Sequence, residues 1–260
     1  MTRLLSGLGL AVAALLLIWF VSSPALLAVA LGVAALAFTE YARIVEAIGA
    51  RIPWWTSGAA TLMACGMVPY PWLSVESVMA GTLLLVAVNV LMSDRTGPPV
   101  LGDTAAAVMA PVYIGLPLGS LVGIHAMAGR EAVLLLMATV AVSDSAQYYA
   151  GRAFGRTPLA PRHSPKKTRE GAMGGFVAAP LFLAVAGYYW MPGIPAGWLA
   201  GLGLGIVVAG IAGDLFESML KRAAGMKDSG HLIPGHGGVL DRIDALLFAA
   251  PTFYFFLRSL

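Results

Sequence analysis

Long apolar stretches separated by short polar segments run along almost the whole chain. They lie at about residues 4–22, 24–43, 54–69, 73–93, 104–127, 131–150, 174–191, 197–221 and 243–259. Most approach the roughly 20 residues that a helix needs to cross a bilayer, whereas membrane β-strands would give alternating segments of about ten residues. The pattern therefore predicts an all-α polytopic membrane protein with about nine transmembrane helices. Because the third stretch is short and interrupted by Gly and Pro, eight spans are the alternative.

Composition and cysteine usage support the same class of protein. Hydrophobic residues make up 59% of the 260-residue chain and charged residues only 11%, whereas a soluble domain has about 25% charged residues. The single cysteine, Cys65, lies in an apolar stretch, so neither an intrachain disulfide nor a cysteine metal cluster is expected. A cleavable signal peptide is not expected either, because the first apolar stretch leads directly into the second.

The distribution of positive charge predicts the orientation of the spans. With the N-terminus inside, all of the 16 Lys and Arg residues except Arg130 and Arg258 fall on the inner side. The positive-inside rule predicts this asymmetry, and removing one span would destroy it. We therefore expect nine helices with a cytoplasmic N-terminus.

Two inner loops, 151–174 and 222–242, stand out by their length and polarity. Loops of this length in compact domains are commonly functional, so the cytoplasmic face is expected to be the working face. We expect about five N-terminal spans in residues 1–130 and a catalytic transmembrane region, which includes both loops, in residues 131–260.

Acidic side chains gather at two predicted helix ends. Residues at i, i+3, i+4 and i+7 share one face of the eighth helix: Asp214, Glu217, Ser218 and Lys221. Asp241 and Asp244 share a face at the start of the ninth helix. If these helix ends meet, the carboxylates would repel one another, and a bound Mg²⁺ would relieve the repulsion. The alternative is a set of ion pairs that holds the loop, Asp241 with Arg222 and Asp244 with Arg242.

Asp144 lies late in the sixth apolar stretch. An Asp at the centre of a spanning helix costs about 2.5–3.5 kcal/mol on insertion scales, so such residues usually have a function. Tyr148 and Arg152 follow at i+4 and i+8 and continue a polar stripe towards the cytoplasm. Asp144 is therefore a candidate metal ligand, and the alternative is a hydrated Asp paired with Arg152.

Two basic clusters suit phosphate groups. The first is Lys166 and Lys167, and the second is Lys221, Arg222, Lys227 and Arg242. For the first cluster the alternative is a patch that sets topology and attracts anionic lipid headgroups. Glycines at 235, 237 and 238 surround His236 and would let backbone N–H groups approach an anion. They form no Walker motif, and a plain turn is the alternative.

Residues 218–244 fit the pattern S-x-φ-K-R-x4-K-D-x-G-x2-φ-P-x-H-G-G-φ-x-D-R-φ-D, where φ is apolar, at every fixed position. In this segment the chain resembles the bacterial phosphatidate cytidylyltransferases, also called CDP-diacylglycerol synthases. The upstream residues Ser164-Pro165-Lys166-Lys167-Thr168 resemble the same family, and the resemblance covers roughly residues 140–260. Gln147 departs from it, because the family usually has a small residue directly before Tyr148.

The resemblance implies transfer of CMP from CTP to phosphatidate, which yields CDP-diacylglycerol and pyrophosphate in phospholipid biosynthesis. It implies Mg²⁺ with room for a second cation, a site in the bacterial cytoplasmic (inner) membrane, a homodimer and no nucleic-acid partner. The attacking phosphate has a second pKa near 6, so it is already an anion at neutral pH and needs no general base.

Site roles are assigned on the same basis. The expected catalytic residues are Asp214, Asp241, Lys221 and Arg242. The expected metal ligands are Asp214, Asp241, Asp244 and Asp144. The expected substrate-binding residues are Lys166, Lys167, Ser218, Arg222, Lys227, His236, Gly237 and Gly238. The alternatives are a CTP-dependent polyprenol or phytol kinase, an anion transporter and a scaffold without activity.

Overall fold

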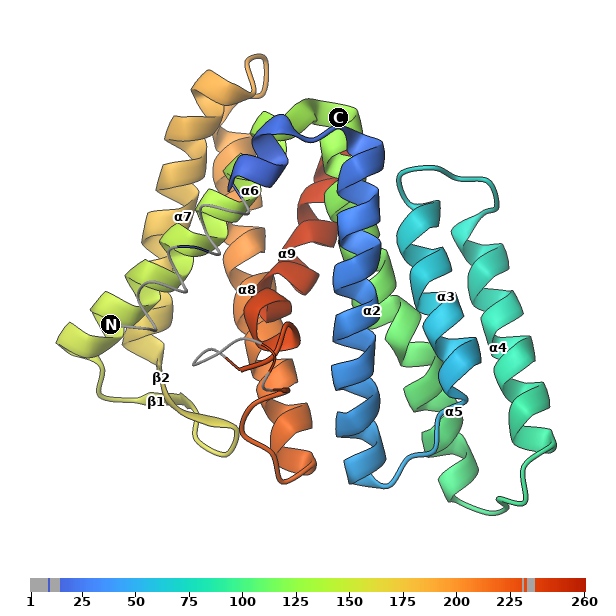
Figure 1. Cartoon of the computed structure of the whole chain (residues 1–260). Helices are drawn as coiled ribbons and strands as arrows, with labels where there is room; N and C mark the ends of the chain where they lie inside the picture. The colour runs from blue at the N-terminus through green and yellow to red at the C-terminus, as the bar shows by residue number, and fades with distance from the viewer. Residues whose placement is uncertain (1–8, 10–14, 231, 233–236) are drawn as a thin grey trace. The chain divides into compact units, whose positions relative to one another are not determined.

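The computed structural model describes residue 9 and residues 15–230, 232 and 237–260. The regular elements of its described part are α-helices, one π-helical turn and one short hairpin, which confirms the predicted all-α class (Figure 1). The elements in chain order are α2 (Ser23–Ile48), α3 (Trp54–Met67), α4 (Val75–Leu91), α5 (Pro99–Ala110), η1 (Pro111–Gly115), α6 (Leu116–Phe154), β1 (Pro158–Ala160), β2 (Ser164–Thr168), α7 (Arg169–Trp190), α8 (Ala196–Ala223) and α9 (Leu240–Arg258). Residues 15–20 are helical as well.

By length and composition, four helical stretches of the described chain can cross a membrane, so this is a multi-pass membrane protein. They are Ser23–Ile48, Pro99–Phe154, Arg169–Trp190 and Ala196–Ala223. The second stretch is interrupted at Gly129, whose φ of 78° and ψ of 179° are not helical. A positive φ costs glycine little, and this break lies between the predicted stretches 104–127 and 131–150.

The chain divides into two compact units. The first unit is Met1–Ala126 with Leu220–Arg242, and the second unit is Met127–Met219 with Ile243–Leu260. The sequence predicted a different kind of division, at residue 130, between a membrane-spanning part and a catalytic part. That division concerns function, which the two compact units do not test, so it stays a prediction.

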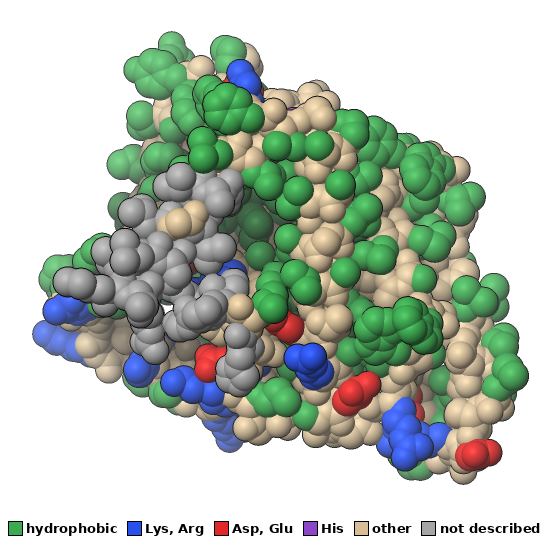
Figure 2. Space-filling model, in the orientation of Figure 1, with side chains coloured by type: hydrophobic (Ala, Val, Ile, Leu, Met, Phe, Trp, Pro, Cys, Tyr) green, Lys and Arg blue, Asp and Glu red, His purple; other side chains and the backbone are tan. Residues whose placement is uncertain are grey.

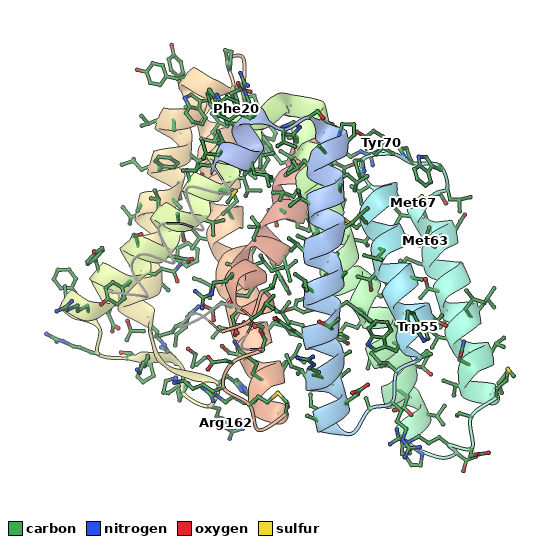
Figure 3. The ribbon with its side chains drawn as sticks, in the orientation of Figure 1. Phe20, Trp55, Met63, Met67, Tyr70 and Arg162 are labelled. Atoms are coloured by element: carbon green, nitrogen blue, oxygen red, sulfur yellow. The ribbon has the colours of Figure 1, made fainter. Side chains whose placement is uncertain are left out.

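In the first unit, α3 packs against α2, α4 and η1, and α4 packs against α5. Hydrophobic side chains cover much of the face over α3 and α4, with charged side chains near the α4–α5 turn (Figure 2). Along α3, Trp55 and Met63 are exposed, whereas Met67 is buried (Figure 3). Exposed apolar side chains of this kind are expected on a helix that faces lipid.

In the second unit, the predicted loop 151–174 is largely ordered. α6 continues to Phe154, β1 and β2 form an antiparallel hairpin, and α7 begins at Arg169 rather than near Gly174. The early start has a local cause, since Thr168 Oγ1 accepts a hydrogen bond from the Gly171 N–H at 3.0 Å and thereby caps the helix. The Glu170 carboxylate accepts the N–H groups of Arg156 and Thr157 at 3.0 and 3.2 Å. These bonds fix the basic hairpin to the start of α7.

Candidate active site

Asp241, in the first turn of α9, forms an ion pair with Lys221, in the last turn of α8. Only 6% of the Asp241 side chain and 11% of the Lys221 side chain are exposed. The sequence offered Arg222 as the partner of Asp241, but the Arg222 guanidinium instead donates to the Met226 carbonyl at 3.3 Å. The first unit therefore brings two of the predicted catalytic residues, Lys221 and Asp241, into direct contact.

Three further hydrogen-bond donors surround Asp241. Its Oδ2 accepts the N–H groups of Ser229 and Gly238, both at 2.8 Å, and lies 2.9 Å from the Ser229 hydroxyl. Burial raises the pKa of the Asp241 carboxyl, but the hydrogen bonds from Lys221, Gly238 and Ser229 outweigh burial and hold that pKa below its usual range. The carboxylate is therefore ionised at neutral pH.

Two glycines next to Asp241 leave room for this arrangement. Gly237 has a φ of 81°, and a Cβ there would lie 2.5 Å from Asp241 Oδ2. A Cβ on Gly238 would collide with the Ser229 hydroxyl and the Glu40 carboxylate. The N–H of Gly238, predicted to face a substrate anion, is bonded to Asp241 instead. His236, the third candidate of this motif, lies outside the described residues.

Glu40 of α2 is a site residue that the sequence analysis missed. Its side chain is buried, and the residue is only 4% exposed. Its carboxylate accepts hydrogen bonds from Val239 N at 2.9 Å, Leu240 N at 2.8 Å and the Ser229 hydroxyl at 2.8 Å. The available signal was an acidic residue inside the apolar stretch 24–43, because such residues usually have a specific partner.

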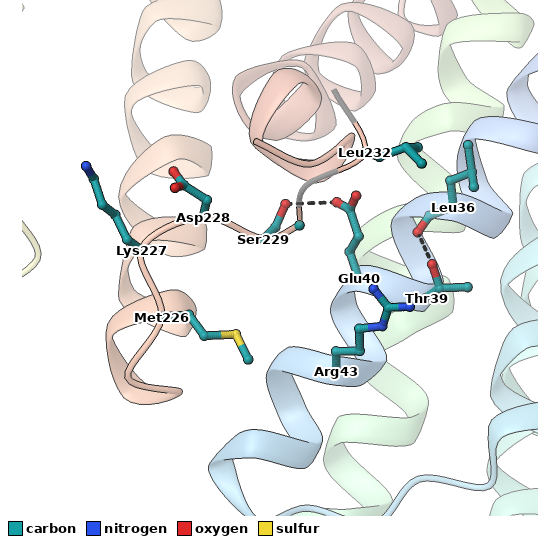
Figure 4. Close-up of a pocket in the computed structure, with 10 residues that line it drawn as sticks. Leu36, Thr39, Glu40, Arg43, Met226, Lys227, Asp228, Ser229 and Leu232 are labelled. Carbon is teal, nitrogen blue, oxygen red and sulfur yellow. Dashed lines mark hydrogen bonds between the residues drawn. The ribbon is translucent and has the colours of Figure 1, made fainter. Parts of the chain in front are cut away.

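A cavity of about 720 Å³ adjoins these residues in the first unit (Figure 4). It is lined by Leu36, Thr39, Glu40, Arg43, Met226, Lys227, Asp228, Ser229, Gly230 and Leu232. Lys227 was predicted to bind substrate, whereas Arg43 was not singled out. Two cationic residues on the wall of a cavity of this size suit a ligand with phosphate groups.

The second unit has its own cavity, of about 480 Å³, beside the basic hairpin. Four predicted site residues line it, together with Gln147: Asp144, Lys166, Lys167 and Asp214. Lys167 Nζ lies 2.5 Å from Asp214 Oδ2, and both side chains are partly exposed. The Gln147 amide donates to the Ser143 hydroxyl at 3.0 Å and lies 3.5 Å from Asp144 Oδ1. The structure thus places Asp144 and Asp214 together with both lysines of the first basic cluster.

Three further predicted site residues, Ser218, Asp244 and Arg242, lie at the end of α8 or the start of α9. Ser218 Oγ is 3.4 Å from Asp214 Oδ1, which is long for a hydroxyl hydrogen bond. Asp244 Oδ1 accepts the N–H of Ala245 at 2.7 Å. Arg242 lies in the first turn of α9, where its N–H donates to the Val239 carbonyl at 3.0 Å. The roles expected of these three residues stay predictions.

The fit to Mg²⁺ differs between the two units. Within the described residues, no group of three or more His, Cys, Asp or Glu side chains is placed to hold a metal ion. Mg²⁺ is usually held by one or two carboxylates together with substrate phosphates and water, and Asp144 and Asp214 on one cavity wall fit that requirement. Asp241 accepts hydrogen bonds from Lys221, Ser229 and Gly238, so metal binding there would need a rearrangement.

Two cavities with cationic side chains on their walls, in a multi-pass membrane protein, suit the binding of phosphate groups. The chain belongs to the cytidylyltransferase family, whose model matches residues 1–260. The resemblance seen in residues 218–244 is therefore confirmed at the level of the family.

Several curated proteins are similar to this chain. A phosphatidate cytidylyltransferase of Thermotoga maritima is 37% identical over 175 residues, which is 65% of this chain and 65% of the relative. One of Brucella melitensis is 48% identical over 130 residues, or 49% of this chain and 47% of the relative. The uncharacterized protein YnbB of Escherichia coli is 38% identical over 193 residues, or 69% of this chain and 61% of the relative. Each alignment spans less than two thirds of the relative's length.

Proposed function

We propose that this protein transfers CMP from CTP to phosphatidate and releases CDP-diacylglycerol and pyrophosphate. The observation that carries the proposal is the cavity of the second unit, where two carboxylates and two lysines meet, in a chain of the cytidylyltransferase family. Relatives named phosphatidate cytidylyltransferases support the choice of lipid substrate. The product is an intermediate of phospholipid biosynthesis.

The reaction exchanges one phosphoanhydride bond for another. An oxygen of the phosphatidate phosphate forms a bond to the α-phosphorus of CTP, the bond from that phosphorus to the bridging oxygen breaks, and pyrophosphate leaves. Because the attacking phosphate is already an anion at neutral pH, no residue has to remove a proton. The main obstacle is repulsion between two anions, so catalysis depends on charge neutralisation and positioning.

The cationic residues suit this task. Lys167, which pairs with Asp214 in the structure, would turn towards a phosphate oxygen when substrate enters, and Lys166 would hold a second phosphate group. Lys221, Arg222, Lys227 and Arg242 would bind the triphosphate or the leaving pyrophosphate. A bound Mg²⁺, with room for a second cation, would neutralise phosphate charge. We propose Asp144 and Asp214 as its ligands, with Asp241 and Asp244 as further candidates.

We also propose nine spans with a cytoplasmic N-terminus, in the bacterial inner membrane. Helices occur within every predicted stretch from 24–43 onwards, and the break at Gly129 divides a stretch too long for one crossing of a core about 30 Å thick. Phosphatidate would then enter sideways from the inner leaflet. A homodimer is a further proposal, which mass measurement in detergent would test.

The test of the function uses the purified full-length chain in vesicles that contain phosphatidate. Addition of CTP and Mg²⁺ should produce CDP-diacylglycerol, detected by mass spectrometry of the extracted lipids, together with pyrophosphate in the aqueous phase. Diacylglycerol and a polyprenol serve as alternative acceptors. Phosphorylation of either of them without formation of CDP-diacylglycerol would contradict the proposal and favour a CTP-dependent lipid kinase.

A further inference from the structure

Glu40 reaches residues far away in the sequence. It lies on α2, and its three hydrogen-bond donors are Ser229, Val239 and Leu240, between 189 and 200 positions later. All four residues belong to the first unit. An acidic side chain that is almost fully buried is costly unless hydrogen bonds compensate for the lost hydration, and here each carboxylate oxygen has at least one donor.

Two of the donors lie at the start of α9. The first N–H groups of a helix have no partner within the helix and must be satisfied from outside. Glu40 Oε1 accepts the N–H of Val239, and Oε2 accepts the N–H of Leu240, the first residue of α9. A carboxylate at this position also interacts favourably with the helix dipole. Glu40 therefore caps α9 from a different helix.

The third donor links Glu40 to Asp241. The Ser229 hydroxyl lies 2.8 Å from Glu40 Oε2 and 2.9 Å from Asp241 Oδ2 (Figure 4 shows the contact with Glu40). A hydroxyl has a single proton to donate, so it can serve only one of the two carboxylates at a time. The Ser229 N–H holds Asp241 in addition. Glu40, Ser229, Asp241 and Lys221 thus form one continuous chain of contacts, which we term the Glu40 network.

We propose that Glu40 is a positioning residue for the reaction: through the Glu40 network it holds Asp241 and Lys221 in their working geometry. The inference rests on the proposed function, since it assigns Glu40 a role in that same reaction. Glu40 itself is not expected to contact the reacting atoms. An N-terminal helix would thereby have a specific task in a reaction whose predicted residues all lie after residue 140.

The first part of the test is independent of activity. Hydrogen exchange of the full-length protein in detergent would be compared between the wild type, Glu40→Gln and Glu46→Gln. Gln keeps the shape of Glu but turns one acceptor into a donor, so the backbone N–H of either Val239 or Leu240 loses its partner. That amide should then exchange roughly tenfold faster in Glu40→Gln, as expected for one lost hydrogen bond. Glu46, exposed on the same helix, controls for the loss of an acidic side chain from α2.

The second part measures CMP transfer. Glu40→Gln should lower kcat by about 10- to 100-fold, the effect expected when a reacting group is misplaced by a fraction of an ångström to one ångström. The KM for CTP should change less than kcat, because the other proposed triphosphate ligands, Arg222, Lys227 and Arg242, are not members of the Glu40 network. Ser229→Ala removes only the hydroxyl link, so it should lower kcat less than Glu40→Gln, and the double variant should resemble Glu40→Gln alone.

The outcomes separate the two proposals. Wild-type exchange at amides 239 and 240 in Glu40→Gln, or faster exchange without a loss in kcat, would overturn the positioning role. A wild-type protein that transfers no CMP would overturn the proposed function, while the exchange data would still decide whether Glu40 holds the start of α9. If Glu40→Gln does not accumulate in membranes, Ser229→Ala decides the matter, and an unchanged kcat in that variant would contradict the inference.

Discussion

Lys221 and Asp241 form an ion pair between the last turn of α8 and the first turn of α9. Each side chain also lies at the helix end that suits its charge, since cations are favoured at the C-terminus of a helix and anions at the N-terminus. The ion pair joins the end of α8 to the start of α9, the two helices that the intervening segment connects. Asp241 therefore has a structural role as well as its proposed catalytic role, and experiments must separate the two.

Asp241→Asn should abolish most turnover without removing the protein from the membrane. Asn keeps the size of Asp but loses the charge that pairs with Lys221, and misplacement of a catalytic group by about one ångström can cost about 10²-fold in kcat. The measurement is CMP transfer at equal amounts of membrane-inserted protein. Asp94→Asn, in an exposed turn, is the control and should keep wild-type activity. Wild-type activity of Asp241→Asn would exclude a catalytic role for Asp241.

The stability of the same variant should depend on pH with a defined sign. The folded-state pKa of Asp241 is lowered, so its contribution to stability is fully present above the unfolded value of about 3.9 and is lost as pH falls through the folded value. The difference in thermal unfolding between wild type and Asp241→Asn should thus be largest above about pH 5 and shrink below about pH 4. If the difference in thermal unfolding between the two proteins instead grew towards low pH, the lowered pKa of Asp241, and the hydrogen bonds that lower it, would be contradicted.

Asp144 and Asp214 should determine the metal requirement. Because the two carboxylates line the same cavity, replacement of either by Asn should raise the Mg²⁺ concentration for half-maximal activity by about tenfold or more, a loss typical of altered metal sites. A chelator should abolish wild-type activity, and added Mg²⁺ should restore it. Binding of Mn²⁺, followed by electron paramagnetic resonance without substrate, provides a second readout. An unchanged metal dependence in both variants would exclude these residues as ligands.

Lys227→Ala should raise the apparent KM for CTP more than that for phosphatidate. Lys227 lines the cavity of the first unit, and its ammonium group is expected to neutralise one phosphate charge, an effect of about tenfold in KM. Arg162→Ala, which removes an exposed charge at the turn of the hairpin (Figure 3), serves as the control. An unchanged CTP dependence would refute a nucleotide-binding role for Lys227.

Gly171→Ala should destabilise the second unit. An added Cβ would lie 2.8 Å from the Gln147 carbonyl oxygen and 3.2 Å from the Gly151 Cα, both backbone atoms. Overpacking of this kind costs about 1–3 kcal/mol, and it should also lower activity because the basic hairpin is fixed to the start of α7. Gly201→Ala in α8 meets open space and should be neutral. Equal thermal stability of the two variants would argue against the close approach of α6 and α7.

The sequence allowed the helices and the family to be predicted because these depend on local patterns. Apolar runs near 20 residues identify spanning helices without any tertiary information, and the residues of 218–244 carry the family pattern at fixed spacing. The end of α6 and the start of α7 were less predictable. There a strand pair and the Thr168 cap replaced the expected loop, and such boundaries depend on single hydrogen bonds.

The partners of the site residues could not be predicted in the same way. Lys221 and Arg222 are adjacent in sequence but point in directions about 100° apart around the helix, so only the packing decides which of them meets Asp241. Glu40 presented a similar difficulty. Its position in an apolar stretch indicated that it needed partners, but nothing in the local sequence indicates that these lie about 190 positions away.

The most direct test of the proposed activity follows two labels on CTP. Purified protein in mixed micelles with phosphatidate and Mg²⁺ would receive CTP labelled at the α-phosphate in one reaction and at the γ-phosphate in another. We predict that the α label enters the lipid fraction and that the γ label leaves as pyrophosphate. Entry of the γ label into lipid would identify a lipid kinase, and absence of both labels from lipid would contradict nucleotidyl transfer by this protein.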